Sequence, residues 1–213
     1  MTYKGLWINP EVLVRRMRTI IGKYGYEKAQ SLRSLKKERE AWTTAIWAIG
    51  RAQVTKKEYW VEIETVENTP DTKLHFIDQS AGYNHIMTHN FEVVDWVEQV
   101  ADLMEVIEKK CKRAYPEYFA LLILARKNAF ISLKKISSRI EKLRVPFEAV
   151  WLVGRRMGSL ASIAQLYPRV ERIDFDIANI THNRRRKTDF LIPQHRGRST
   201  ATTPLGSIYL PIP

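Results

Sequence analysis

The sequence contains a single cysteine, Cys111, among its 213 residues. One cysteine excludes an intrachain disulfide and any zinc site made of several cysteines, so Cys111 is most simply a small buried apolar residue. The longest apolar run, FALLILA at residues 119–125, is much shorter than the roughly 20 residues that a helix needs to cross a bilayer. The N-terminus also lacks the pattern of a signal peptide. These absences predict a cytoplasmic (intracellular) protein with no membrane partner.

Several catalytic signatures are missing as well. The sequence has no P-loop, no glycine-rich dinucleotide fingerprint and no GxSxG elbow, which argues against P-loop nucleotide hydrolysis and serine hydrolase chemistry. His85 and His89 have a spacing that would suit zinc on a helix. They fall in a glycine-containing stretch, residues 80–89, that we expect to be a loop, and no cysteine partners accompany them. The sequence therefore gives little support for zinc.

Positive charge is what the sequence has in excess. It contains 35 Lys and Arg against 23 Asp and Glu, a formal net charge of +12. Such an excess attracts polyanions, and nucleic acid is the partner that it predicts. Solubility alone and an anionic membrane surface are the alternatives.

The pattern of apolar residues predicts alternating strands and helices. Val61 and Ile63 alternate with Glu62 and Glu64, as in a half-buried strand, and the continuous run at residues 119–125 is typical of a strand buried on both faces. The expected order is a helix over 26–50, strands over 59–68, 72–77 and 91–95, a helix over 97–111, a strand over 119–125, a helix over 131–143, a strand over 147–154, a helical turn at 163–166 and a strand over 170–177. This order predicts an α/β fold with a mixed central sheet flanked by helices.

Three regions follow from this division. Residues 1–27 form an N-terminal helical segment, residues 28–178 the α/β core, and residues 179–213 a basic, proline-containing C-terminal tail. We expect this tail to contact nucleic-acid phosphates without reading bases. Its alternative is an arm that packs on a second subunit, as in a homodimer. The candidate nucleic-acid-binding residues are Arg184, Arg185, Arg186, Lys187, Arg196 and Arg198.

Acidic residues mark a candidate site in the core. Asp71 follows Pro70 just before the second strand of the core, and Glu92 lies in the third. If these strands pair as neighbours, both carboxylates come within reach of one divalent cation. Glu38 falls on the apolar stripe of the preceding helix, where an unpaired acid is costly, whereas Glu40 is expected to point elsewhere. Glu64 could join the site from the end of the first strand.

The order of elements and acids resembles the PD-(D/E)XK nuclease superfamily, which has a restriction-endonuclease-like fold, over about residues 28–155. The resemblance implies a metal-dependent DNA endonuclease, with DNA as its partner, in which Asp71 and Glu92 bind Mg²⁺ or Mn²⁺ and a helical acid, Glu38, assists. It also implies a lysine two residues after Glu92, but this chain has Val94 there.

Val94 leaves two hypotheses open. In the first, Lys73 substitutes for the missing lysine, because it lies two residues after Asp71 and so on the same face of its strand. In the second, the fold has lost its chemistry and serves as a nucleic-acid-binding or assembly protein. Asp71 as a turn residue and Glu92 as a solvated strand acid would fit the second hypothesis.

Overall fold

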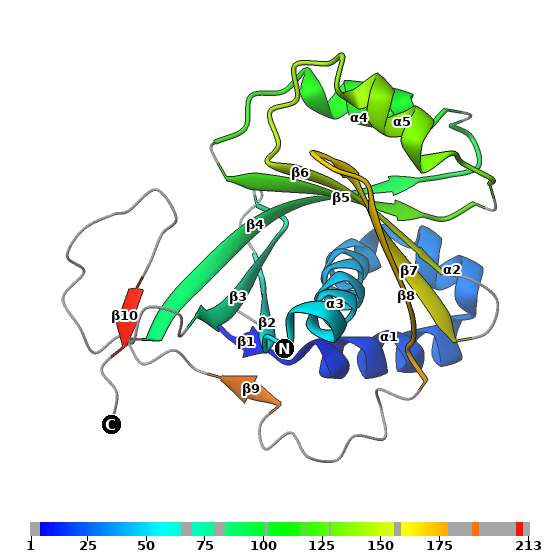
Figure 1. The fold of residues 1–213 in the computed structure, drawn as a ribbon. Coiled ribbons are helices and arrows are strands. Elements are labelled where there is room, and N and C mark those ends of the chain that lie inside the picture. Colours follow the sequence, from blue (N-terminus) through cyan, green and yellow to red (C-terminus); the bar gives the residue numbers. More distant parts are fainter. Residues whose placement is uncertain are drawn as a thin grey trace.

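A computed structural model gives the arrangement of the chain. It describes residues 5–64, 70–78, 84–100, 102–116, 118–127, 129–155, 159–178, 189–191 and 208–210. Within these ranges the strands form one mixed sheet in the order β8-β7-β6-β5-β4-β3-β2-β1-β9, and β10 pairs with β4 (Figure 1). The strands are β1 (Trp7–Ile8), β2 (Tyr59–Ile63), β3 (Thr72–Asp78), β4 (Asn84–Trp96), β5 (Phe119–Ala125), β6 (Ala149–Arg155), β7 (Leu160–Tyr167), β8 (Glu171–Asp176), β9 (Phe190–Leu191) and β10 (Ile208–Leu210).

Strand direction changes in the middle of the sheet. β2, β3 and β4 form an antiparallel meander, β5 lies parallel to β4 and β6 parallel to β5, and β7 and β8 return antiparallel. Parallel neighbours need a crossover, which α4 supplies between β4 and β5 and α5 between β5 and β6. The prediction of an α/β fold with a mixed sheet flanked by helices is confirmed.

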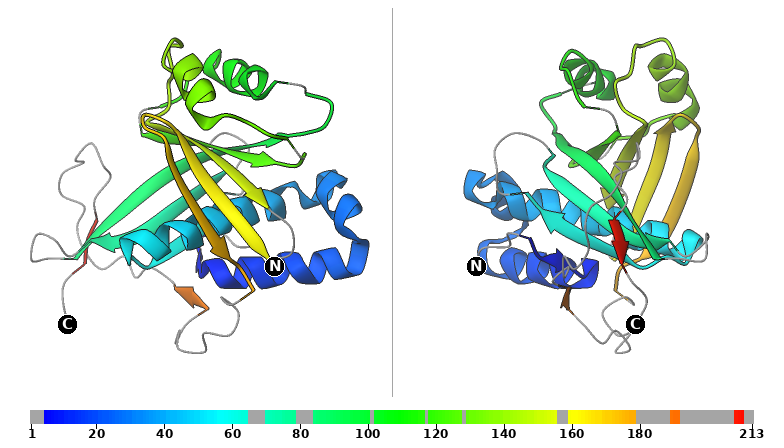
Figure 2. Two further views of the ribbon diagram at one scale, coloured as in Figure 1. Left: turned by 45° about the vertical axis from the view of Figure 1, so that its right-hand side comes forward. Right: turned by 90° about the vertical axis from the view of Figure 1, so that its left-hand side faces the viewer.

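Helices cover both faces of the sheet, as the views in Figure 2 show. One face carries α1 and α3, and the other carries α4 and α5. The sequence FALLILA supplies both cores, because Leu122 and Leu124 pack toward α3 while Leu121 and Ile123 pack toward α4 and α5. The helices are α1 (Pro10–Tyr24), α2 (Tyr26–Ser31), a 3₁₀ turn η1 (Arg33–Leu35), α3 (Lys36–Thr55), α4 (Leu103–Cys111) and α5 (Leu133–Ile140).

Helix α3 lies between α1 and the sheet and is therefore buried on two sides. Trp42 lines a small cavity together with Val14 and Met17 of α1. Trp47, further along the helix, packs edge-on against Phe91 of the sheet, with ring centroids 5.0 Å apart. A helix in this position needs apolar residues on two faces, and this decides which of its acids is buried.

Three sequence predictions are wrong in detail. The helix expected over 26–50 breaks at η1, so that α3 starts at residue 36. The stretch 80–89 is not a loop throughout, because β4 already begins at Asn84 and pairs with β3 there. The helical turn expected at 163–166 is part of β7, whose pairing with β6 and β8 satisfies its backbone groups.

The candidate basic residues of the tail, 184–187, 196 and 198, lie outside the described residues. In the part of the chain that the structure describes, no helix is both long and apolar enough to span a membrane.

Candidate functional site

Asp71 is fixed at the point where β3 begins beside β4. Its backbone amide donates to the carbonyl of Phe91 at 2.9 Å, and its Oδ2 accepts from the backbone amide of Val93 at 2.9 Å. The carboxylate thus makes a link to β4 just beyond the last paired residues, Thr72 and Phe91. Both hydrogen bonds hold Asp71 at the point where β4 continues beyond the end of its pairing with β3.

Glu40 approaches Asp71 from α3. It is buried, with 3% of its surface exposed. One turn later Thr44 places its hydroxyl 2.7 Å from that of Thr72, which follows Asp71 in the sequence. The ammonium of Lys37 lies 3.1 Å from Oε2 of Glu40 and 3.6 Å from Oδ1 of Asp71. One cation is therefore shared by the two carboxylates.

The electrostatics of the site follow from burial and from this crowding of acids. Burial, and then the nearby charge of Asp71, raises the pKa of Glu40. The pKa of Lys36 is raised too, first by its hydrogen bond to Glu40, whose Oε1 lies 3.1 Å from the ammonium. The charges of Glu40, Asp71 and Glu92 all add to that rise. Lys36 is consequently a cation in the field of three acids.

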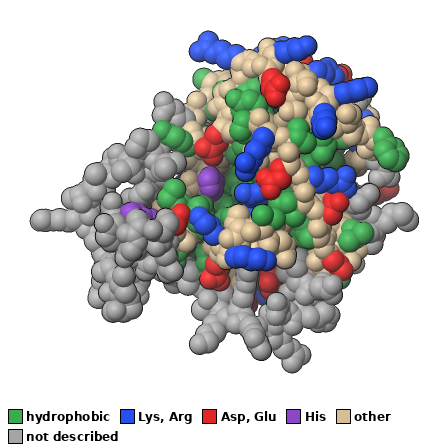
Figure 3. Space-filling model, in the orientation of Figure 1, with side chains coloured by type: hydrophobic (Ala, Val, Ile, Leu, Met, Phe, Trp, Pro, Cys, Tyr) green, Lys and Arg blue, Asp and Glu red, His purple; other side chains and the backbone are tan. Residues whose placement is uncertain are grey.

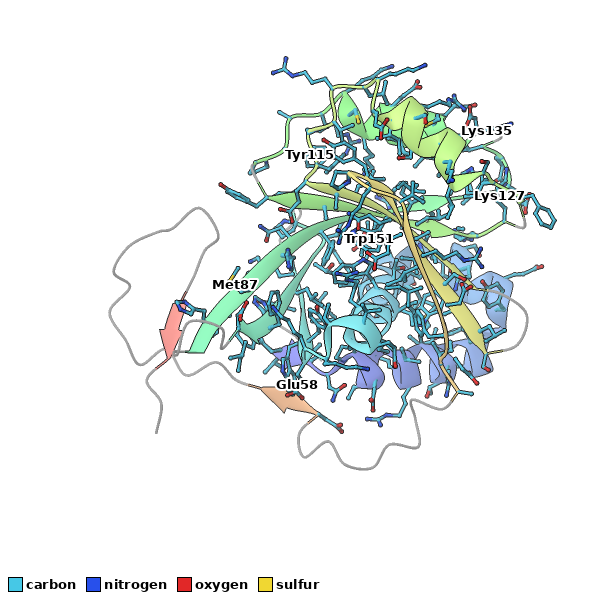
Figure 4. The ribbon with its side chains drawn as sticks, in the orientation of Figure 1. Glu58, Met87, Tyr115, Lys127, Lys135 and Trp151 are labelled. Atoms are coloured by element: carbon cyan, nitrogen blue, oxygen red, sulfur yellow. The ribbon has the colours of Figure 1, made fainter. Side chains whose placement is uncertain are left out.

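Glu92 is buried on the face of β4 that carries α4 and α5, opposite to the face that carries α3. It pairs with Lys110, from the last turn of α4, and it is 6% exposed. Burial, and then the charge of Glu92, raises the pKa of Tyr115 to about 12; Figure 4 shows Tyr115 between the sheet and the α4–α5 layer. Val94, two residues on, packs against the apolar core under α4 and α5.

The structure corrects the choice of helical acid. Glu38 faces α1, where Arg16 lies 3.2 Å from its Oε1, whereas Glu40 faces the sheet and Asp71. The expectation that Glu40 points away from the core is wrong.

Two further predicted site residues pair with each other. Glu64 follows β2 and forms an ion pair with Lys73 of β3. Lys73 and Glu92 occupy the same face of the sheet, because Lys73 lies opposite Asn90 in the register. The described contacts give Lys73 no partner at the site other than Glu64, and the ammonium that spans Glu40 and Asp71 is that of Lys37.

The two histidines remain apart from this site. Both lie in β4 rather than in a loop, and His89 contacts Glu148 at 3.4 Å. Among the residues that the structure describes, no group of three or more His, Cys, Asp or Glu is arranged to hold a metal ion.

Lys36, Lys37, Glu40 and Lys110 are the site residues that the sequence pattern missed. The spacing of Lys36 and Glu40, four residues apart at the start of a helix, was a visible signal for an ion pair on one helical face. Lys110 gave none, because its contact with Glu92 depends on how α4 packs on β4.

No protein-family model matches this chain, and searches of curated proteins and of solved structures found no match. Its function is therefore inferred from the geometry of the site.

Proposed function

We propose that the protein is a metal-dependent DNA endonuclease that hydrolyses phosphodiester bonds at a site centred on Glu40 and Asp71, with Glu92 on the neighbouring strand β4. One observation carries this proposal. A carboxylate from helix α3, that of Glu40, and one from the start of β3, that of Asp71, lie close enough to share the ammonium of Lys37, at 3.1 Å and 3.6 Å. A buried acid such as Glu40, held beside a second carboxylate, is costly unless it serves a function or is well paired.

The order of elements supports a restriction-endonuclease-like fold. Helix α3, the antiparallel strands β2 to β4, helix α4 and the parallel strand β5 follow one another as the resemblance to the PD-(D/E)XK superfamily implies. Asp71 precedes the second strand of this unit, and Glu92 lies in the third. Glu40 takes the role expected of a helical acid in place of Glu38.

The residues of the site suit Mg²⁺ or Mn²⁺. Magnesium is usually held by one or two carboxylates together with water and substrate phosphate. Glu40 and Asp71 already share one cation, the ammonium of Lys37, and these two carboxylates would hold the metal. When bound, the metal would lower the pKa of a water molecule and offset negative charge on the phosphate.

Lys36 supplies the positive charge that Val94 cannot. A lysine with a raised pKa remains protonated at neutral pH. It therefore suits binding of a phosphate oxygen and stabilisation of its charge, and it does not suit removal of a proton from water. In this proposal Lys36 takes the role for which the sequence suggested Lys73.

A second candidate function is nucleic-acid binding without catalysis. It is favoured by the balance of charge, because Lys36, Lys37 and Lys110 match Glu40, Asp71 and Glu92 one for one. A divalent cation would have to displace at least one ammonium group from its carboxylate.

A cleavage assay separates the two functions. Supercoiled plasmid and linear duplex are incubated with the protein in Mg²⁺, Mn²⁺ or EDTA, and nicked and cut products are measured. The variants are Glu40→Gln and Asp71→Asn, which keep the shape of each side chain, with Glu38→Gln as the matched control on the same helix. We expect metal-dependent cleavage that falls by about a hundredfold or more in the two site variants and stays near the wild-type rate in Glu38→Gln.

Two results would contradict the nuclease proposal. Salt-sensitive DNA binding without nicking in either metal would support the second function. Cleavage that is equal in all variants would place the chemistry outside this site.

A further inference from the structure

The outer surface of the α4–α5 layer is strongly basic. Residues 102–116 and 126–146, which include both helices, contain eleven Lys and Arg against four Asp and Glu. Figure 3 shows Lys and Arg gathered over this upper part of the molecule. The basic residues are Lys109, Lys110, Lys112, Arg113, Arg126, Lys127, Lys134, Lys135, Arg139, Lys142 and Arg144, and the acidic residues are Asp102, Glu105, Glu108 and Glu141. Most of the excess charge of the chain is therefore carried here.

Among the described residues, three of these cations form ion pairs with carboxylates. Arg139 pairs with Asp102 at 2.7 Å, Arg126 with Asp95 at 2.9 Å, and Lys110 with Glu92. Lys134 and Lys135 are exposed on α5, and no ion pair joins either of them to a carboxylate among the described residues. Neighbouring like charges repel each other, and a bound polyanion relieves this repulsion.

An exposed aromatic residue stands between Lys127 and Lys134 in the chain. Phe130 is 110% exposed and belongs to the segment that joins β5 to α5. The base of this segment is held in place, because Lys127 donates to the carbonyl of Val100 at 2.9 Å and its ammonium lies 4.8 Å from the ring centroid of Trp96. In Figure 4, Lys127 and Lys135 project from the same end of the layer. Phe130 makes no contribution to the core, so its ring is available to a partner outside the fold.

We propose that this surface binds single-stranded nucleic acid, with phosphates along Lys134 and Lys135 and one unstacked base on the ring of Phe130. Aromatic stacking beside a basic groove is how proteins bind single strands without reading their sequence. A base inside a duplex offers no free face to such a ring. The inference deepens the proposed function and rests on it for nucleic acid as the partner.

An anionic membrane is the competing partner for a basic surface with one exposed aromatic ring. A helix that lies in a membrane interface needs a broad apolar face. The apolar residues Ile136 and Ile140 of α5 are buried in the core instead, so the described surface favours the nucleic acid.

Binding is tested with a fluorescently labelled single-stranded oligonucleotide, in EDTA so that no cleavage occurs, with anisotropy measured over a range of salt concentrations. Phe130→Leu keeps an apolar side chain and removes the aromatic ring, whereas Phe130→Trp keeps a ring. We expect the first to weaken binding by about fivefold or more and the second to bind as the wild type does. A duplex of the same sequence should not respond to Phe130→Leu.

The charged residues are tested by the salt dependence. We expect the double variant Lys134→Gln, Lys135→Gln to make the slope of log K against log salt shallower by about 1.4, or roughly 0.7 for each phosphate that the variant no longer neutralises. The control, Lys23→Gln with Lys28→Gln on the opposite helical layer, should leave the slope unchanged.

Any of three results would overturn this inference: no binding of single strands, equal affinity of Phe130→Leu and wild type, or Phe130-dependent binding to vesicles of anionic lipid in place of the oligonucleotide. These outcomes are independent of catalysis. If the nuclease proposal is wrong, single strands will still bind but no DNA will be nicked. If this inference is wrong, metal-dependent nicking will be seen, and Phe130→Leu and the double lysine variant will leave it unchanged.

Discussion

The hydrogen bond between Thr44 and Thr72 predicts an unequal pair of mutational effects. Both residues are fully buried, and their hydroxyls lie 2.7 Å apart. The hydroxyl of Thr44 also lies 3.1 Å from the carbonyl of Glu40, to which it donates. Since a hydroxyl has one proton, Thr72 must be the donor in the bond between the two threonines.

The direction of this bond sets the magnitudes. Thr44→Val leaves the Thr72 hydroxyl buried without its acceptor, which should cost about 1–3 kcal/mol of unfolding free energy. For a chain of this size that corresponds to a fall in Tm of roughly 2–12 °C. Thr72→Val leaves Thr44 with its bond to Glu40 and should cost only about 0.5–1.5 kcal/mol. The double variant replaces both hydroxyls by methyl groups and should be more stable than Thr44→Val alone.

Urea unfolding of the wild type, the two single variants and the double variant in EDTA gives the free energies of unfolding for this double-mutant cycle. The same variants enter the plasmid assay, because the bond sets the approach of Glu40 to Asp71. We expect Thr44→Val to lower the nicking rate more than Thr72→Val does. Additivity of the two single effects to within about 0.5 kcal/mol would refute the reasoning.

Two further predictions concern the packing of α3 and the charge of its buried acid. A Cβ on Gly50 would lie 2.6 Å from the ring of Phe175 and 2.7 Å from Cδ1 of Ile163, so Gly50→Ala should destabilise the protein despite a gain of about 1 kcal/mol in helix propensity. A Cβ on Gly22 meets nothing within 4 Å, so Gly22→Ala should stabilise the protein by that amount. Equal Tm shifts of the two variants would contradict the packing argument. The pKa of Glu40 is raised in the folded protein. Its carboxyl therefore makes its full contribution to the free energy of unfolding only below the pKa that it has in the unfolded chain. This contribution is lost as the pH rises through the pKa that it has in the folded protein. Glu40→Gln should therefore gain stability relative to the wild type from acidic to neutral pH in EDTA, as urea midpoints measure, and a constant difference across this range would count against a buried, crowded carboxylate.

The sequence predicted the types of most elements correctly, because they depend on local periodicity. The alternation of Val61 and Ile63 with polar residues indicated β2, and the unbroken apolar run at 119–125 indicated the doubly buried β5. The prediction missed the first half of β4, where the pattern is polar and strand structure depends on pairing with β3. It missed β7 for a similar reason, since Ile163–Leu166 is a short apolar run that periodicity alone assigns to neither type.

The charge, the order of most elements along the chain and the acids at Asp71 and Glu92 were determined by the sequence alone, whereas the order of strands in the sheet was not. Which other residues meet them was decided by tertiary structure. A single apolar stripe pointed to Glu38, but α3 is buried against both α1 and the sheet, and it is Glu40 that faces Asp71. The same packing lets Lys37 reach both Glu40 and Asp71, while the docking of α4 brings Lys110 to Glu92. Contacts between elements distant in the chain leave no periodic signal, so only the folded structure reveals them.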